Sequence, residues 1–139
     1  YPRRARAGAR IRQLVICQDI APTLIRLAGA RPGAQIQGRS LLPLLAGQRG
    51  GWRKSFLIEY WAENAMPWLV GMTYKAIRTD RYKYIRWVNR GRNGELDEFY
   101  DLDLDPFEQV NRNSSRRYAG VRDGLRRELR RLVADAAGL

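Results

Sequence analysis

The segment from residue 74 to residue 111 alternates in character, and this alternation constrains the fold more than any other feature. Residues 82–88 would place different side chains on the two faces of a strand. One face would carry Tyr82, Tyr84 and Arg86, and the other Lys83, Ile85 and Trp87. A Thr-Asp pair separates two such runs, so residues 71–78 and 82–88 are predicted to form an antiparallel hairpin. After a reversal rich in Gly and Asn, a third strand over 98–102 is predicted to return alongside.

Shorter elements are expected before this meander. Residues 11–17 are predicted to form a short apolar strand. Asp19 is expected to cap the helix that follows, its carboxylate accepting a backbone N–H of the first turn. A second, short helix is expected from Ser40 to Gly47, and residues 56–61 are predicted to form a further strand.

The C-terminal segment has the periodicity of an amphipathic helix. Its apolar residues recur every three or four positions: Tyr118, Val121, Leu125, Leu129, Leu132 and Ala136. Its arginines are expected on the opposite, solvent-exposed side: Arg122, Arg126, Arg127, Arg130 and Arg131. Such a helix could lie on an anionic membrane, but packing across the sheet explains the pattern with fewer assumptions. We therefore expect an α+β fold, a small antiparallel β-sheet with the C-terminal helix packed on it.

Composition excludes several kinds of chemistry. The 139 residues include no His, which excludes His-based acid–base catalysis and His-ligated metal within the chain. The single cysteine, Cys17, excludes an internal disulfide and is expected to be a buried, inert thiol. The net charge of +12 indicates either a general surface bias toward Arg or a basic nucleic-acid-binding module. The tyrosines of the sheet could stack bases in such a module, but acidic residues interrupt the same sheet.

Acidic residues gather after the third predicted strand, and they are Asp101, Asp103, Asp105 and Glu108. The cluster resembles a calcium loop, but it lacks the spacing, the central Gly and the terminal Glu of that loop. We therefore predict a solvated acidic turn that pairs with arginines, and no metal site. No catalytic residue is expected in this chain either.

A candidate substrate-binding loop follows the strand predicted over 56–61. Aromatic and acidic residues flank it, a combination that suits sugar rings and their hydroxyls. We predict that substrate is contacted by Glu59, Tyr60 and Glu63. The alternative is that Trp61 and Trp68 are core anchors of a small sheet.

Several motifs, in this order, resemble the C-terminal part of the sulfatases. R-T-D-R-Y-K-Y-I at 78–85 and E-F-Y-D-L-D-L-D-P-F-E-Q-V-N at 98–111 are similar to the C-terminal signature of that family. Upstream, D-I-A-P-T-L-I-R-L-A-G-A at 19–30 and Q-G-R-S-L-L-P-L-L-A-G at 37–47 also resemble it. W-R-K-S-F-L-I-E-Y at 52–60 is similar to the glycan-directed branch that includes the N-acetylglucosamine-6-sulfatases.

The resemblance implies the C-terminal subdomain of an alkaline-phosphatase-like sulfatase fold over residues 51–139. Residues 1–50 would be a connecting segment with two short helices that completes a missing N-terminal catalytic domain, the partner of this chain. The whole enzyme would hydrolyse sulfate esters of small molecules or glycans. Its calcium ion and its formylglycine, formed from Cys or Ser in C/S-x-P-S-R, would lie in the missing part, because the surroundings of Cys17 do not match that motif. The chain alone would be catalytically incomplete. No specific nucleic acid is expected as a partner, and no transmembrane segment, since no apolar run is long enough.

Overall fold

The computed structural model describes residues 5, 7–48, 50–61, 72–88 and 96–138. They belong to two compact units, Tyr1–Lys54 and Ser55–Leu139, which we call unit 1 and unit 2. The division falls four residues after the boundary expected from the sequence. Each unit is described by itself.

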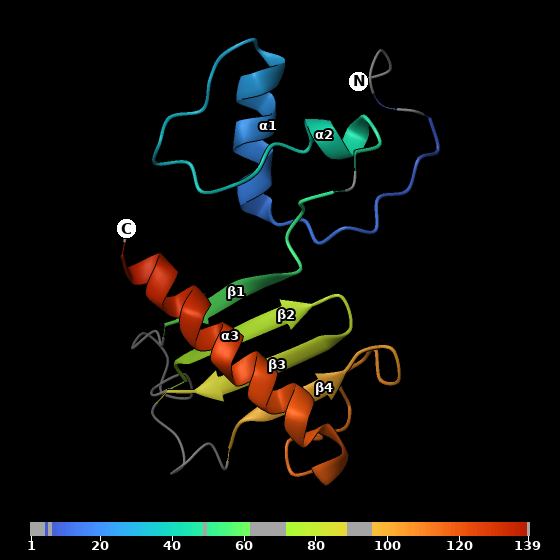
Figure 1. The fold of residues 1–139 in the computed structure, drawn as a ribbon, viewed down its shortest axis with the longest axis vertical. Coiled ribbons are helices and arrows are strands. Elements are labelled where there is room, and N and C mark those ends of the chain that lie inside the picture. The colour runs from blue at the N-terminus through green and yellow to red at the C-terminus, as the bar shows by residue number, and fades with distance from the viewer. Residues whose placement is uncertain (1–4, 6, 49, 62–71, 89–95, 139) are drawn as a thin grey trace. The chain divides into compact units, whose positions relative to one another are not determined.

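Unit 2 contains a four-stranded antiparallel sheet in the order β1-β2-β3-β4 (Figure 1). Its strands are β1 (Ser55–Tyr60), β2 (Tyr74–Thr79), β3 (Tyr82–Trp87) and β4 (Glu98–Asp101). The register places Ile77 opposite Tyr84 and Tyr84 opposite Phe99. In the β2–β3 turn, the hydroxyl of Thr79 accepts a hydrogen bond from the backbone N–H of Tyr82 at 2.8 Å. The predicted meander is therefore confirmed, and β1 extends it at the edge next to β2.

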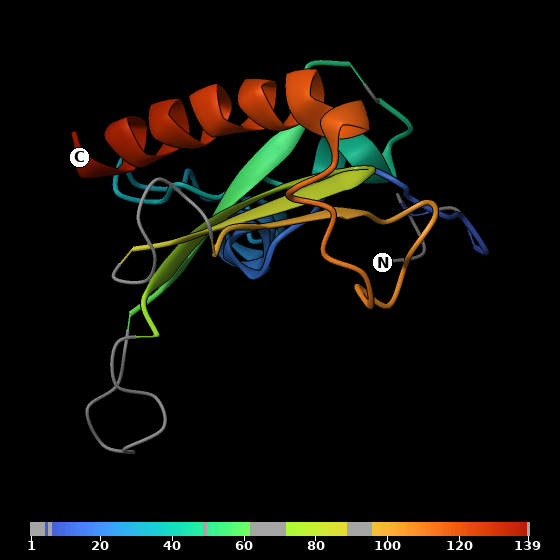
Figure 2. The ribbon, with the colours of Figure 1, turned by 90° about the horizontal axis from the view of Figure 1, so that it is seen from below.

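Helix α3 (Ala119–Ala137) follows the 3-10 turn η3 (Arg116–Tyr118) and lies across one face of the sheet (Figure 2). Side chains from the sheet and the helix form one core beneath it: Ile77, Tyr84, Phe99, Tyr118, Leu125 and Leu129. The other face of the sheet carries a second cluster, Ala76, Ile85 and Tyr100. Alternate residues of each strand thus serve different layers, and the predicted α+β fold is confirmed.

The predicted faces of α3 were wrong at several positions. Val121 is 38% exposed, and Ala136 is exposed as well, because only the middle turns of the helix contact the sheet. Arg126 was expected to face solvent, but its side chain is only 30% exposed. Its Nε donates to the hydroxyl of Tyr84 at 2.8 Å, and its Nη2 lies 3.4 Å from the carboxylate of Asp97. A long arginine side chain can thus reach a buried polar pair at the rim of the core.

Unit 1 is built from the 3-10 turn η1 (Cys17–Asp19) and the helices α1 (Ile20–Leu27) and α2 (Leu42–Leu45). The strand predicted over 11–17 was wrong, since residues 11–16 are irregular. Side chains supply partners that a neighbouring strand would provide: the carbonyl of Leu14 accepts from the indole N–H of Trp52 at 2.7 Å. Cys17 was expected to be buried but is exposed.

The longest described helix, α3, is rich in arginine, and no helix among the described residues combines the length and apolar character needed to cross a bilayer.

Candidate functional site

The predicted substrate-binding residues of β1 lie on opposite faces of the sheet. The carboxylate of Glu59 pairs with the ammonium of Lys75 on β2, with 3.0 Å between Oε1 and Nζ. Tyr60 points to the other face, where its ring stacks on Tyr74 with 5.5 Å between centroids. Neighbouring residues of a strand alternate in this way, so β1 alone does not bring the two together. Glu63 lies outside the described residues.

Lys75 was not singled out from the sequence; the pairing of β1 with β2 places it directly opposite Glu59. Its ammonium also lies 5.3 Å from the ring centroid of Trp61, at cation–π distance. Trp61 is 63% exposed, so it is not the core anchor of the alternative interpretation. An acceptor, a cation and an open aromatic ring therefore meet where β1 ends. Trp68 lies outside the described residues.

An aromatic row crosses this end of the sheet on the face opposite α3. Tyr74 meets Trp87 edge to face, with centroids 5.4 Å apart. The carboxylate of Glu98 accepts from the indole N–H of Trp87 at 2.9 Å and from the hydroxyl of Tyr100 at 2.6 Å. Burial and the bond to Glu98 raise the pKa of Tyr100. The row fixes the end of the sheet from which the candidate loop departs.

The base-stacking interpretation requires accessible tyrosines, and the sheet does not offer all of them. Tyr84 is 1% exposed beneath α3, and Tyr82 packs against the same core. Tyr74 and Trp87 lie on the opposite face and are engaged with each other. Two of the four rings thus pack on the α3 side and two on the other, so they do not share one face of the sheet.

The acidic turn is a structural anchor rather than a solvated cluster. Asp101 is fully buried, and Arg81 reaches it through Nε at 2.9 Å and Nη2 at 2.7 Å, while the hydroxyl of Tyr118 donates to it at 3.1 Å. The carboxylate of Asp105 accepts from the backbone N–H groups of Gln109 and Val110. The expected pairing with arginine is confirmed. The prediction of a solvated turn was wrong for Asp101 and Asp105, because their buried carboxylates accept hydrogen bonds from within the protein.

These contacts also lower the pKa values of the two buried aspartates of the turn. The hydrogen bond from Arg81 is the main reason why the pKa of Asp101 lies below its ordinary value. Backbone N–H groups lower the pKa of Asp105 in the same way. Both carboxylates are thus ionised and already engaged. In the described ranges we find no group of three or more His, Cys, Asp or Glu residues that could hold a metal ion.

Unit 1 is organised around the buried carboxylate of Asp19. Arg53 binds it with both terminal nitrogens, one of them at 2.6 Å, and the backbone N–H of Arg39 donates to it at 2.8 Å. Burial alone would raise the pKa of Asp19, but the hydrogen bonds from Arg53, Arg39 and Ile16 outweigh burial and lower it. The expected helix cap was wrong, because the carboxylate is directed away from the first turn of α1 and holds three other segments.

A second contact joins the same segments. The hydroxyl of Thr23 donates to the backbone carbonyl of Asp19 at 2.6 Å and accepts from the backbone N–H of Leu41 at 2.8 Å. Gly38 allows this close approach, because a Cβ there would lie 1.9 Å from the carbonyl oxygen of Gln18. The segments 19–30 and 37–47 are therefore locked together by structural bonds.

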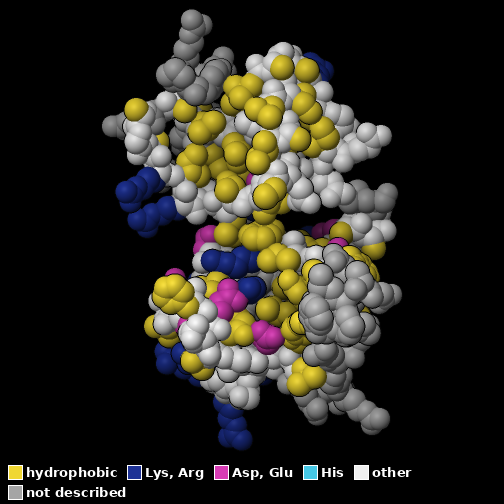
Figure 3. Space-filling model, turned by 180° about the vertical axis from the view of Figure 1, so that it is seen from behind, with side chains coloured by type: hydrophobic (Ala, Val, Ile, Leu, Met, Phe, Trp, Pro, Cys, Tyr) yellow, Lys and Arg dark blue, Asp and Glu magenta, His cyan; other side chains and the backbone are white. Residues whose placement is uncertain are grey.

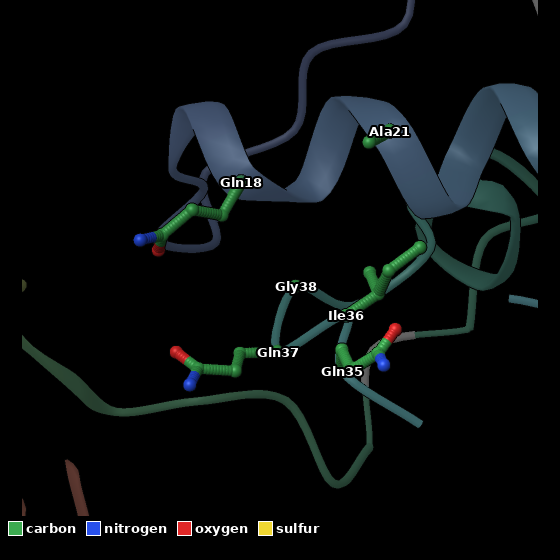
Figure 4. A pocket seen from close by; sticks show the side chains of 6 residues that line it. All are labelled: Gln18, Ala21, Gln35, Ile36, Gln37 and Gly38. Carbon is green, nitrogen blue, oxygen red and sulfur yellow. The ribbon is translucent and has the colours of Figure 1, made fainter. Parts of the chain in front are cut away.

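An open pocket of about 260 Å³ lies between the start of α1 and the segment 35–38 (Figure 4). It is lined by Gln18, Ala21, Gln35, Ile36, Gln37 and Gly38. No charged side chain lines it, and most of its lining residues are exposed. It offers amide groups for hydrogen bonding but no acid, base or nucleophile.

Comparison with known proteins places this geometry in a family. The family model for the C-terminal part of N-sulphoglucosamine sulphohydrolase matches residues 1–135. An N-acetylglucosamine-6-O-sulfatase of Bacteroides thetaiotaomicron is 32% identical over 86% of the chain. That match spans 21% of the relative, so the chain corresponds to about a fifth of its length.

Two solved structures are similar in fold as well as sequence. One, in complex with its substrate D-glucosamine-2-N,6-O-disulfate, is 31% identical with a TM-score of 0.70, over 81% of this chain and 22% of the other. The other, a phosphonate monoester hydrolase of Agrobacterium radiobacter, is 28% identical with a TM-score of 0.76, over 93% of this chain and 27% of the other.

The family model spans nearly the whole chain, and the motifs that resemble the sulfatase signature form its buried contacts. The chain belongs to the N-sulphoglucosamine sulphohydrolase C-terminal family, and its fold is that of the C-terminal portion of the alkaline-phosphatase-like sulfatases.

Proposed function

We propose that the complete enzyme hydrolyses sulfate esters carried by glycans, and that this chain closes one side of its active-site cleft. The observation that carries the proposal is the joining of two sulfatase-like motifs by one ion pair. Arg81, from the motif at 78–85, holds the buried carboxylate of Asp101, from the motif at 98–111. The relative that acts on N-acetylglucosamine 6-O-sulfate and the structure with a bound disulfated glucosamine support a glycan substrate.

The reactive groups are proposed to lie in the remainder of the enzyme. The carboxylates of Asp101 and Asp105 are already taken by Arg81 and by backbone N–H groups, so they do not fit a calcium ion. The surroundings of Cys17 do not match the formylglycine motif. We therefore assign calcium and formylglycine to the N-terminal part, and we treat residues 1–50 as the segment that completes it.

The part of this chain proposed to meet the substrate is the end of β1 with the loop after it. Glu59 offers a hydrogen-bond acceptor, Lys75 a cation and Trp61 an exposed ring face. Tyr60 and Glu63 complete the set proposed from the sequence. Sugar hydroxyls, an anionic substituent and the apolar face of a pyranose ring would find matching partners there.

A second candidate function is hydrolysis of phosphonate monoesters. It is favoured by the similarity to the Agrobacterium radiobacter hydrolase, which extends over 93% of the chain. Sulfate and phosphonate monoesters both present a tetrahedral anionic centre, so one fold can host either activity.

The two candidates are separated by a paired assay on the complete enzyme. We expect release of sulfate from N-acetylglucosamine 6-sulfate and from p-nitrophenyl sulfate, with kcat/KM for sulfate esters well above that for phenyl p-nitrophenyl phosphonate. A preference for the phosphonate ester would replace the first proposal with the second. Failure to turn over any of these esters, with formylglycine confirmed by mass spectrometry, would refute both.

A further inference from the structure

Helix α3 carries more positive charge than its own carboxylates neutralise. It contains five arginines and three acidic residues. Asp123 lies 3.8 Å from Arg126. Arg131 pairs with both Glu128 and Asp135, at 2.7 and 2.6 Å. Two arginines thus engage all three carboxylates, and the surplus charge lies on the other three arginines.

Two of these three, Arg127 and Arg130, are exposed and lie roughly one turn apart on the side of α3 directed away from the sheet. The third, Arg122, donates to the backbone carbonyl of Asn113. Within the described ranges, neither Arg127 nor Arg130 has a hydrogen-bond or ion-pair partner. The helix macrodipole stabilises cations in the last turn, but the last turn of α3 has no basic residue. Neither pairing nor the macrodipole therefore accounts for the two exposed arginines.

Basic and acidic side chains lie together on the face of the sheet opposite α3. Figure 3, which views unit 2 from that side, shows them beside one another. Lys83 on that face pairs with Glu108 at 2.7 Å. Arg78, directly across from Lys83, donates to the backbone carbonyls of Thr79 and Asp80. These two basic groups are therefore engaged within the protein, unlike the two exposed arginines of α3.

The exposed arginines lie on the same side of the sheet as the candidate substrate residue Glu59. Alternate residues of β1 share a face, and Leu57, between Ser55 and Glu59, packs against the core beneath α3. The carboxylate of Glu128 accepts from the hydroxyl of Ser55 at 3.2 Å, which ties the turn that carries Arg127 to the start of β1. Glu59 is four residues further along the strand, about 13 Å away. A glycan of several sugars that contacts Glu59 is therefore long enough to reach the arginines of α3.

We propose that Arg127 and Arg130 bind a sulfated polysaccharide, and that the enzyme thereby holds a polymeric substrate through sulfate groups other than the one it hydrolyses. The proposal rests on the proposed function, which supplies the sulfated glycan. A guanidinium is permanently charged and donates paired hydrogen bonds to anionic oxygens, so it suits a sulfate group.

Other anionic partners fit this surface less well. Proteins that bind single-stranded nucleic acids stack the bases on aromatic rings, and α3 contains no aromatic residue. An amphipathic helix binds a membrane through its apolar face, but the apolar residues Leu125 and Leu129 of α3 are packed on the sheet. A flexible sulfated chain needs only the exposed cations.

The test measures binding of fluorescently labelled dextran sulfate to the complete enzyme by anisotropy, at about 0.1 M salt, with unsulfated dextran as the uncharged control. Arg127→Gln combined with Arg130→Gln should weaken binding about fivefold or more, because two exposed charge pairs are lost. Replacing both arginines by Lys keeps the charge and should retain most of the binding. Arg78→Gln combined with Lys83→Gln removes the same charge from the opposite face and should leave binding within about twofold. Melting followed by circular dichroism checks that each variant is folded.

Unchanged binding after Arg127 and Arg130 are both replaced by Gln would overturn the proposal. An equal loss in the Arg78 and Lys83 variant would overturn it too, since net charge alone would then explain binding. So would tighter binding of double-stranded DNA or of phosphatidylserine vesicles than of dextran sulfate, because the occupant would be another polyanion. Binding is measured without turnover. Binding that depends on the two arginines, in an enzyme that releases no sulfate from any ester, would therefore refute the proposed function and leave the polysaccharide-binding surface of α3 in place.

Discussion

Replacing Asp101 by Ala should destabilise unit 2 more than any other single change in the acidic turn. The substitution removes a fully buried carboxylate that accepts two hydrogen bonds from Arg81 and one from the hydroxyl of Tyr118. Breaking a buried ion pair by removing one partner costs about 3–5 kcal/mol. The side chain of Arg81 is 43% exposed and can be rehydrated, so the lower end, about 3 kcal/mol, is expected.

Thermal unfolding followed by circular dichroism measures this effect. For a domain of about 60–100 residues, 1 kcal/mol shifts Tm by about 4–8 °C, so the loss should be at least about 12 °C. Asp103→Ala is the matched control, because Asp103 is the same residue type in the same turn and faces the same arginine. Its side chain is 66% exposed and lies 3.5 Å from Arg81. An exposed pair of this kind contributes about 0–1 kcal/mol.

Similar shifts for the two variants would refute the reasoning. A small loss for both would mean that Asp101 is hydrated in solution and that the turn is a surface feature. A large loss for both would mean that the net charge of the turn, rather than the buried contact, supports the fold.

Leu129→Asp should unfold the chain in the same melting assay, since an unpaired buried charge costs several kcal/mol, whereas Arg130→Glu, on the exposed side, should change stability by about 0.5 kcal/mol. Arg126→Glu should also destabilise, because it would place a carboxylate beside Asp97, and a neutral result would show that the contact with Tyr84 is unimportant. Hydrogen bonds lower the folded pKa of Asp101, so its stabilisation is present above the ordinary value of 3.8 and is lost as pH falls through the folded pKa; Asp101→Asn should flatten the loss of Tm below about pH 4. The isolated chain should not hydrolyse p-nitrophenyl sulfate with or without calcium, and turnover that survives removal of contaminating enzyme would contradict this. Its binding to DNA should show no base preference and should disappear at about 0.3 M salt.

The sheet could be predicted from the sequence because alternate residues of its strands differ in character and belong to two different faces. Alternation over 82–88 separates Tyr84, under α3, from Ile85, on the other face. Because side chains alternate with a period of two, a shift of the strand register by one residue would exchange the side chains of the two faces. Similarly, the spacing of Leu125 and Leu129 predicted the buried line of α3.

Two of the failures share a physical cause, which is that the partner lies far away in sequence. Asp19 has the local pattern of a helix cap, but its partner Arg53 is 34 residues away and captures the carboxylate. Arg126 looks solvent-facing on a helical wheel, yet Tyr84, 42 residues away, supplies a buried hydroxyl. Local propensity does not show which distant hydrogen-bond partner a charged side chain will reach.

The candidate site was predictable in part. Glu59 and the exposed Trp61 lie together at the end of β1, and the pairing of β1 with β2 adds Lys75. Tyr60 was predicted to contact substrate together with Glu59, but strand alternation turns it to the opposite face, where it stacks on Tyr74. A motif of consecutive letters hides this difference, since neighbouring residues of a strand belong to different surfaces.

The most direct test of the central claim is the ratio of kcat/KM for N-acetylglucosamine 6-sulfate to that for p-nitrophenyl sulfate in the complete enzyme carrying Glu59→Ala. The aryl ester needs only the sulfate pocket, whereas the sugar also needs partners for its hydroxyls. Losing one such contact costs about 1–3 kcal/mol, so the ratio should fall about tenfold or more while the aryl ester is hydrolysed normally. Glu128→Ala, on α3, should leave the ratio unchanged. If Glu59→Ala lowered both activities equally, or changed neither in a folded enzyme, this end of β1 would not contact the glycan.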